Sequence, residues 1–256
     1  MQKAENQSTV ITVDKKKGIC HILLNRPRCL NAVNDELRTR LYEALKEIAV
    51  DRETKVLIIE GAGEHFSSGA DVNLFNQEVS LWRIRMKEVS KIIILMREMP
   101  QIIICKVRGV AYGVAANLAL ACDFVVASET MRFCEVFSNI GLIPDGGGHY
   151  FLPRIVGLAK AMELALLGEE IDGLTAASKG LIYKCVPDSD LDKEADQLAS
   201  KLANKSSQAM VLIKEGLVGS YDMTLNEVME WEAAHQTIML QTEEHKASLR
   251  TLLRVK

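Results

Sequence analysis

Arg108–Gly157 has the sequence RGVAYGVAANLALACDFVVASETMRFCEVFSNIGLIPDGGGHYFLPRIVG. Within it, a small-residue turn leads into an apolar helix expected over Val114–Ala121, and a buried strand expected over Asp123–Ala127 follows. An Ile-Pro-Asp-Gly-Gly-Gly loop comes later, and glycine lets backbone N–H groups approach a ligand closely. The carboxylate of this loop, Asp145, is therefore a candidate for proton transfer if apolar neighbours enclose it.

The chain has 256 residues, 48% of them hydrophobic, which fits one domain or one domain with a small appendage. The formal net charge is −3 and no basic run interrupts that balance, so we expect neither a nucleic-acid partner nor a membrane partner. Met1–Ser8 is mostly polar, and apolar stretches such as Ile102–Cys105 are too short to span a bilayer. We expect a soluble globular protein of the cytoplasm.

The cysteines occur singly, mostly inside apolar runs, with no CxxC pair and no Cys/His cluster of zinc-binding spacing. They are Cys20, Cys29, Cys105, Cys122, Cys134 and Cys185. Buried, reduced thiols are the interpretation, and no metal site is expected. Cys134 lies close to the proposed site and stays open as a minor alternative nucleophile.

The first part of the chain alternates strands and helices. The expected elements are a hairpin of Val10–Asp14 and Ile19–Asn25, a helix with Leu37, Leu41, Leu45 and Ile48 on its apolar face and Asn34 or Asp35 as its N-cap, strands at Val56–Glu60 and Gln101–Val107, a helix at Ser90–Met99, and a strand at Met131–Cys134. The repeated strand, strand, helix pattern predicts an α+β (α/β) protein of stacked ββα turns. No GxGxxG or GxxxxGK[ST] motif supports nucleotide binding.

From Leu158 onward the pattern predicts helices throughout. The expected helices are Leu158–Leu167, Ala176–Gly180, Leu191–Leu202, Gln208–Val218 and Thr224–Val255, the last with a break near Gln241 and Thr242. This organisation predicts a core domain over residues 1–200 that carries the ligand site. A helical region over residues 201–256 is expected to cover a ligand or a neighbouring subunit.

Four motifs together resemble the crotonase (enoyl-CoA hydratase/isomerase) family over nearly the whole chain. They are Asn25-Arg-Pro-Arg-Cys-Leu-Asn-Ala32, Phe66-Ser-Ser-Gly-Ala-Asp71, Gly109-Val-Ala-Tyr-Gly113 with Ala116-Asn-Leu-Ala-Leu-Ala-Cys-Asp123, and Gly141-Leu-Ile-Pro-Asp-Gly-Gly147. The resemblance implies a spiral of ββα turns and assembly into trimers or hexamers. It also implies an acyl-CoA thioester substrate, with no cofactor beyond the coenzyme A that the substrate itself carries.

In that family two backbone N–H groups hold the thioester oxygen, and the motifs carry them onto Ala70 and Val114. One such preorganised donor contributes roughly a hundred- to a thousandfold in rate, because negative charge develops on that oxygen. Val114 stands where the hydratases commonly have glycine, but a backbone N–H survives any residue except proline. The resemblance thus predicts an oxyanion hole made of these two amides.

The departures from the family concern the acid–base groups. Hydratases of the family use two glutamates, and the matching positions are Asn117 and Phe137, neither of which can move a proton. Asp145 with these two resembles the double-bond isomerases that include the ring-opening isomerases of phenylacetyl-CoA breakdown, in lipid or aromatic acid metabolism. We hypothesise that Asp145 takes a proton from the α-carbon of a 3-enoyl-type thioester and returns it at the γ-carbon. Phe137 and Ile143 would desolvate Asp145, and Asn117 would orient substrate or water.

The substrate-binding residues are assigned with the same resemblance. Ser68, Gly69 and Asp71 belong to a loop whose free N–H groups would face the ligand, although a tight turn with Asp71 as a helix cap is the simpler interpretation of the loop alone. Arg28 and Lys246 are expected to meet the CoA phosphates, with solvated surface charge as the alternative for Lys246.

Alternatives to the single-Asp isomerase stay open. Without the resemblance, an Asp between Pro and Gly is more often a turn residue than a base. Glu135 is a possible second carboxylate, because a two-residue offset on a strand would place it on the same face as Phe137. The second alternative is a hydratase or related lyase that acts on an unusual dienoyl or cyclic acyl-CoA, with Asp145 managing water. The third alternative is a non-catalytic acyl-CoA-binding module.

Overall fold

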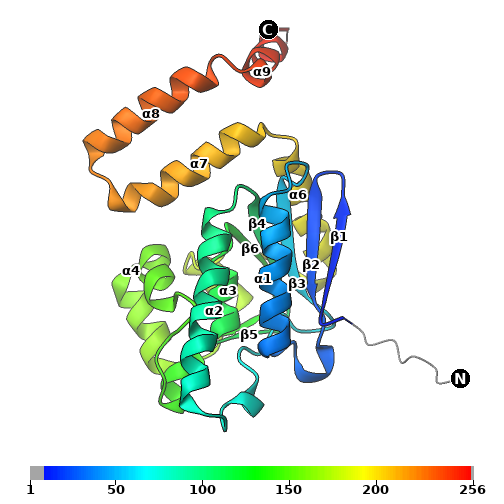
Figure 1. Ribbon diagram of the computed structural model, residues 1–256, viewed down its shortest axis with the longest axis vertical. Helices are drawn as coiled ribbons and strands as arrows, with labels where there is room; N and C mark the ends of the chain where they lie inside the picture. The colour runs from blue at the N-terminus through cyan, green and yellow to red at the C-terminus, as the bar shows by residue number, and fades with distance from the viewer. Residues whose placement is uncertain (1–8, 255–256) are drawn as a thin grey trace, which may run out of the picture. The chain divides into compact units, whose positions relative to one another are not determined.

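The computed structural model describes residues 9–254, and the chain splits into two units between Ala199 and Ser200. The first unit contains a six-stranded sheet in the order β1-β2-β3-β4-β6-β9 and a three-stranded sheet in the order β5-β7-β8 (Figure 1). The strands are β1 (Ile11–Lys16), β2 (Ile19–Leu24), β3 (Val56–Gly61), β4 (Ile102–Val107), β5 (Val110–Tyr112), β6 (Phe124–Ser128), β7 (Arg132–Cys134), β8 (Ile171–Asp172) and β9 (Lys184–Val186).

The chain order confirms the expected ββα turns. Strands β2, β3, β4, β6 and β9 pair in parallel in the large sheet, while β5 and β7 pair in parallel in the small one. The helices of this unit are α1 (Asp35–Ala49), α2 (Val79–Glu98), α3 (Val114–Leu120), α4 (Gly148–Leu167), α5 (Gly173–Ser178) and α6 (Leu191–Ala203), which runs across the division. From β4 onward, the chain therefore alternates between the large sheet and the small sheet.

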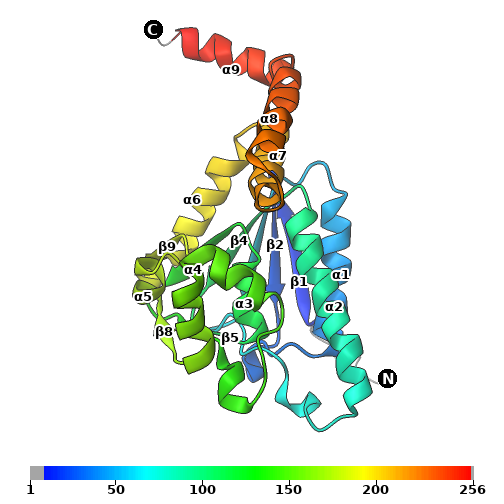
Figure 2. The same cartoon turned by 90° about the vertical axis from the view of Figure 1, so that its left-hand side faces the viewer.

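The predicted hairpin and first helix are confirmed. Strands β1 and β2 pair antiparallel around Lys17 and Gly18, whose φ angles of 51° and 77° suit a two-residue turn. The Asn34 side chain caps α1 by accepting a hydrogen bond from the Leu37 amide at 2.9 Å. Figure 2 shows α1 and α2 side by side against the large sheet.

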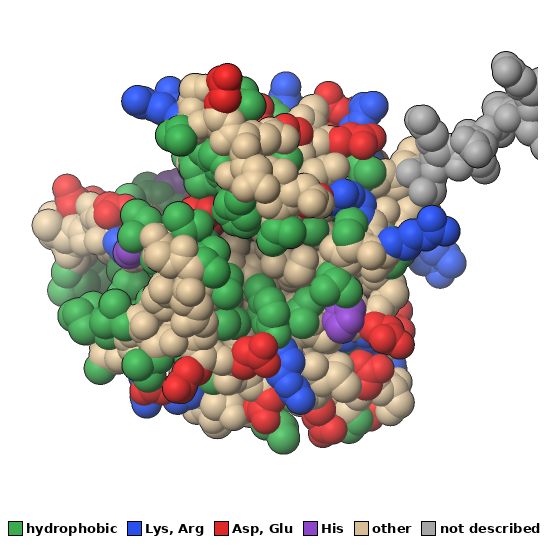
Figure 3. Space-filling view, turned by 90° about the horizontal axis from the view of Figure 1, so that it is seen from below, with side chains coloured by type: hydrophobic (Ala, Val, Ile, Leu, Met, Phe, Trp, Pro, Cys, Tyr) green, Lys and Arg blue, Asp and Glu red, His purple; other side chains and the backbone are tan. Residues whose placement is uncertain are grey.

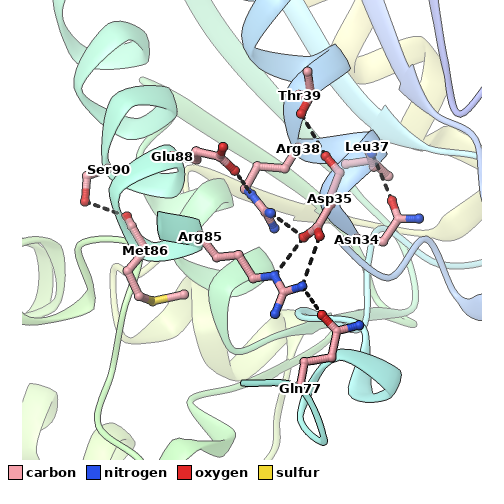
Figure 4. Close-up of polar contacts among 10 residues, drawn as sticks. All are labelled: Asn34, Asp35, Leu37, Arg38, Thr39, Gln77, Arg85, Met86, Glu88 and Ser90. Carbon is pink, nitrogen blue, oxygen red and sulfur yellow. Dashed lines mark hydrogen bonds and ion pairs between the residues drawn. The ribbon is translucent and has the colours of Figure 1, made fainter. Parts of the chain in front are cut away.

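A charged cluster joins α1 to α2 (Figure 4). The Arg85 guanidinium donates to both Asp35 carboxylate oxygens, at 2.8 and 3.0 Å, and to Gln77. Arg38 donates to Asp35 and to Glu88. Helix α2 begins at Val79, so the predicted start at Ser90 was wrong: the buried face of its first turns carries Arg85 where an apolar residue was expected.

The prediction of helices throughout from Leu158 was also wrong. Helix α4 already begins at Gly148 and is interrupted at Gly157, where φ is 76° and ψ is 161°. Strands β8 and β9 follow, and each has only two or three residues. Strands this short show no alternation of apolar and polar residues, so the sequence gives little sign of them.

Five short 3-10 helices complete the described elements. They are η1 (Pro27–Cys29), η2 (Val72–Leu74), η3 (Val136–Ile140), η4 (Asp188–Asp190) and η5 (Ser220–Asp222). The first three lie beside the motifs that the sequence singles out, so these motifs adopt compact turns.

The second unit contains α7 (Ser207–Gly219), α8 (Leu225–Met239) and α9 (Glu243–Arg254). Thr224 and Glu227 form a capping box that starts α8, and the predicted break near Gln241 separates α8 from α9. A Cβ placed on Gly216 would lie 2.7 Å from the Trp231 ring, so α7 and α8 approach closely there. The expected end of the last helix at Val255 lies outside the described residues.

The cysteines are free, and four are buried, but Cys29 is exposed and Cys185 is half-buried. The expectation of buried thiols was therefore wrong for Cys29, which lies in the surface turn η1. Among the described helices, none has both the length and the apolar character needed to cross a bilayer.

Hydrophobic side chains cover much of the face shown in Figure 3, and charged groups lie mainly toward its edges. Helix α4 alone exposes several large apolar side chains, namely Ile155, Leu158, Met162, Leu166 and Leu167. Contiguous apolar surface of this kind is typical of association surfaces. The expected trimer or hexamer stays a prediction.

Candidate active site

Buried hydrogen bonds fix the loop that carries Ala70. Asn31, which is fully buried, donates through its side chain to the backbone oxygens of Ala62 and His65, at 3.0 and 2.7 Å. The Ser67 hydroxyl donates to the backbone oxygen of Asn31 at 2.8 Å. Val33 also pairs with this loop, because its amide donates to the backbone oxygen of Gly69 at 2.7 Å.

An ion pair holds the far end of the same loop. Asp71 accepts hydrogen bonds from Arg26 at 3.0 Å and from the Asn73 amide at 3.2 Å, so it caps η2. Burial opposes ionisation of Asp71, but these hydrogen bonds outweigh it, and the pKa of Asp71 is lowered. Contact of Asp71 with substrate stays a prediction, since its described partners belong to the protein itself.

The second predicted oxyanion donor lies beside the first. The Ser67 amide donates to the Val110 oxygen at 3.0 Å, and the Tyr112 amide donates back to Ser67 at 3.2 Å. A Cβ placed on Gly69 would lie 3.8 Å from the Val114 nitrogen, so the start of α3 adjoins the peptide between Gly69 and Ala70.

Within residues 9–254, neither the Ala70 N–H nor the Val114 N–H donates a hydrogen bond to another group of the chain. Val114 is the first residue of α3, where backbone donors have no partner inside the helix. The two amides therefore belong to neighbouring segments and have no acceptor in the described part of the chain, and an oxyanion hole requires free donors of this kind. Their catalytic role stays a prediction.

Asn117 joins the start of α3 to the loop that carries Asp145. Its side-chain nitrogen donates to the backbone oxygen of Asp145 at 2.8 Å and to a carboxylate oxygen of Glu135 at 3.3 Å. Asn117 is fully buried, and its side-chain oxygen has no partner among the described residues. A Cβ on Gly148 would lie 2.7 Å from the Asn117 nitrogen, so glycine permits this close approach.

The environment of Asp145 suits a base at neutral pH. Burial raises its pKa to about 6. One carboxylate oxygen is buried without a hydrogen-bond partner in the described part of the chain. A carboxylate without donors in a poorly solvated place is more basic than usual, and it titrates close to the pH at which general bases work well.

Glu135 is the functional candidate that the sequence placed least well. It was expected on a strand, but β7 ends at Cys134 and Glu135 precedes η3, so that prediction was wrong. The side chain is nonetheless buried, at 1% exposed, and faces Asn117. The pKa of Glu135 is raised to about 8, mainly by burial; the hydrogen bond from Asn117 opposes this rise and the charge of Asp145 contributes to it.

Phe137 and Ile143 occupy different environments. Phe137 is 5% exposed, and its ring lies 3.5 Å from a Cβ placed on Gly113, so it packs against the turn before Val114. Ile143 is 75% exposed. That Phe137 and Ile143 keep water from Asp145 stays a prediction.

The residues expected to bind CoA are placed as follows. Arg28 lies exposed in η1 and forms no ion pair within the described chain. The Ser68 amide donates to the oxygen of nearby Leu30 at 2.9 Å. Lys246 belongs to the second unit, where it pairs with Glu243 at 2.8 Å. Contact of Arg28, Ser68 and Lys246 with CoA stays a prediction.

Comparisons with known proteins identify the family and the fold. The family model described as enoyl-CoA hydratase/isomerase matches residues 14–253. The chain is 34% identical over 243 residues to the 1,2-epoxyphenylacetyl-CoA isomerase of Escherichia coli K12, covering 93% of each chain. The crystal structure of an enoyl-CoA hydratase from Bacillus anthracis superposes with a TM-score of 0.93 at 28% identity, over 96% of this chain and 97% of that one.

A third similar protein is a putative enoyl-CoA hydratase from Thermobifida fusca, whose crystal structure is described as a complex with CoA. It has a TM-score of 0.85 and 27% identity, over 91% of this chain and 93% of that one. The fold and the site thus define an enzyme of the crotonase type. The chain belongs to the enoyl-CoA hydratase/isomerase family.

Proposed function

We propose that the protein is an acyl-CoA double-bond isomerase in which Asp145 is the base. The observation that carries the proposal is the poorly solvated Asp145 carboxylate, held through Asn117 beside the helix that begins at the Val114 amide. The similarity to an isomerase named for 1,2-epoxyphenylacetyl-CoA adds support. The CoA complex of a similar protein supports a CoA thioester as the substrate class. The proposed reaction uses no cofactor beyond the CoA of the substrate.

The proposed reaction has two proton transfers. The Asp145 carboxylate removes a proton from the α-carbon of a 3-enoyl thioester, and the C–H electron pair moves into a dienolate with its charge on the thioester oxygen. The amides of Ala70 and Val114 stabilise that charge, each by roughly a hundred- to a thousandfold in rate. Delivery of a proton to the γ-carbon then restores the carbonyl and leaves a 2-enoyl thioester.

A hydratase acting on an unusual acyl group is the second candidate, and Glu135 favours it. Addition of water needs one group to activate the water and one to protonate carbon, and Glu135 with Asp145 supplies two carboxyl groups. Similar proteins include a protein named as a hydratase. We favour the isomerase because Asn117 and Phe137 replace both glutamates that the hydratases of this family use.

We also propose self-association into a trimer or a dimer of trimers. The exposed apolar side chains of α4 support this, since such surface is costly to leave in water. Light scattering coupled to size exclusion tests it, and a monomer at micromolar concentration would contradict it.

The reaction is tested by incubating the wild type and Asp145→Asn with 3-enoyl-CoA and 2-enoyl-CoA in D₂O and reading the products by mass spectrometry. Double-bond migration without gain of water, lost in the variant, is the expected result. A hydroxyacyl product would establish the hydratase instead. CoA-ester binding without turnover of either substrate would favour the non-catalytic module.

Glu163→Gln is the matched control for these assays. Glu163 pairs with Lys160 and Lys179 at the surface of α4, so removal of its charge should leave turnover unchanged.

A further inference from the structure

The site holds more buried acceptors than donors. Asn117 Oδ1, Glu135 Oε1 and Asp145 Oδ1 are all buried without a hydrogen-bond partner among the described residues. The Asn117 side-chain nitrogen already serves the Asp145 backbone and the other oxygen of Glu135. A buried acceptor without a donor costs free energy of folding. One additional proton among these three oxygens would supply a donor and lower that cost.

Two neighbouring carboxylates in a buried place do not both ionise readily, because their like charges repel and neither is well solvated. Glu135 is the deeper of the two: it is 1% exposed, whereas Asp145 is only partly buried. The extra proton therefore belongs on Glu135. A carboxylic acid at that position adds the missing donor and leaves Asp145 free to act as a base.

We propose that Glu135 is a second acid–base group of the site, and that it holds a proton as a neutral acid while Asp145 is ionised. This inference rests on the proposed isomerase and assigns its two proton transfers to two different carboxyl groups. Asp145 takes the α-proton, and Glu135 gives its own proton to the γ-carbon. Proton transfer from Asp145 to Glu135 then resets the pair, so no proton is gained or lost over one turnover.

The pH dependence follows from the same assignment. Asp145 must lose its proton to act, and Glu135 must keep its own. The raised pKa values of about 6 for Asp145 and about 8 for Glu135 therefore predict a bell-shaped profile of kcat/KM, rising through the first and falling through the second.

Glu135→Gln tests the assignment, because glutamine keeps the shape and removes the titration. We expect kcat to fall by roughly 10²- to 10⁴-fold and the alkaline limb of the profile to disappear. The product should also change when an α-deuterated substrate reacts in H₂O. In a single turnover of the wild type, Glu135 delivers a solvent-derived proton to the γ-carbon while the deuteron stays on Asp145. In the variant, Asp145 acting alone returns part of its deuterium to the γ-carbon, so the product of the variant should retain more deuterium.

A measurement without substrate separates this inference from the proposed reaction. Carboxyl ¹³C NMR titration of the wild type should show Asp145 ionising at lower pH than Glu135, and in Glu135→Gln only the Glu135 step should be missing. Glu163→Gln should leave that titration unchanged. If the wild type fails to isomerise but Asp145 ionises before Glu135 in the titration, the proposed function fails while the carboxyl pair stands.

Wild-type turnover and an intact alkaline limb in Glu135→Gln would overturn the inference, and so would a wild-type titration in which Glu135 ionises before Asp145. Thermal unfolding, compared with Glu163→Gln, identifies any loss of activity that comes from misfolding. Glu135→Asp should recover the alkaline limb at a reduced rate, which a purely structural role for Glu135 would not predict.

Discussion

The side-chain nitrogen of Asn117 lies 2.8 Å from the backbone oxygen of Asp145. This hydrogen bond ties the loop with the candidate base to α3, whose first amide is the candidate oxyanion donor of Val114. Base and oxyanion donor are therefore positioned by one short helix. Asn117 stands at a position that matches a catalytic glutamate in the family's hydratases. In this chain it links the loop of Asp145 to α3.

Asn117→Ala should lower kcat by about 10²-fold or more, because the Asp145 loop loses its anchor and small misplacements of a base are costly. The unfolding free energy should fall by about 1–3 kcal/mol as a buried carbonyl loses its donor. Gln101→Ala is the matched control, since Gln101 is also buried and donates to backbone oxygens away from the site. Both variants should lose stability, and equal loss of activity would contradict the prediction.

Gly69→Ala should reduce activity sharply, because its Cβ would lie 2.6 Å from the Tyr112 oxygen at a φ of +90°. Relief of that clash moves the Ala70 amide away from the Val114 amide. Gly180→Ala has a similar φ of +71° with no atom within 4 Å, so it introduces the backbone strain alone. Steady-state kinetics should show the loss for Gly69→Ala only, and parallel losses would disprove the argument.

Asp145→Asn should stabilise the protein at high pH. The folded-state pKa of Asp145 is about 6, above its usual value of 3.8, so the folded state binds more protons between these values and wild-type stability falls as pH rises through this window. Asparagine does not titrate. The Tm difference, variant minus wild type, should therefore be more positive at pH 7 than at pH 4, as measured by scanning calorimetry. A Tm difference that is the same at pH 4 and pH 7 would show that the folded-state pKa of Asp145 is not raised.

Asp35→Asn should destabilise the protein by about 1–3 kcal/mol, because Arg38 and Arg85 are each about 4% exposed and lose a charged partner. Hydrogen bonding from Arg85 is the main cause that lowers the pKa of Asp35 to about 2, so this stabilisation should be lost as pH falls from 4 toward 2. Urea titration at pH 7 and pH 3 measures the effect.

Glu43→Gln is the control for the Asp35 substitution. It removes an exposed pair with Arg40 and should cost less than about 0.5 kcal/mol. If Asp35→Asn and Glu43→Gln lower the unfolding free energy equally, burial of Arg38 and Arg85 adds nothing to the strength of their ion pairs.

The sequence predicted the elements with regular apolar spacing. Leu37, Leu41 and Leu45 recur along α1, and the Lys17-Gly18 turn joins two β-branched runs. The start of α2 was missed because a paired, buried Arg85 looks like a surface residue until Asp35 is known to face it. Strands as short as β8 depend on their pairing partners, which only the folded chain supplies.

Some residues of the candidate site could likewise be predicted from the sequence, and others could not. Gly69 and the Asp145 loop could be located because they lie in short motifs that resemble those of the family, and such motifs are local in the sequence. The placement of Glu135 could not, because the chain leaves the strand geometry after Cys134. Its buried carboxylate accepts a hydrogen bond from Asn117, which lies on α3, and only the folded chain brings these two residues together.

The pairing of the loop before Ala70 with β5 has a consequence for folding kinetics. His65 accepts a hydrogen bond from the Val110 amide, 45 positions along the chain. Closing so long a loop costs chain entropy that local helices do not incur. During refolding, helical signal should therefore return before the ability to bind an oxyanion, and recovery of activity should report the last of these long-range contacts to form.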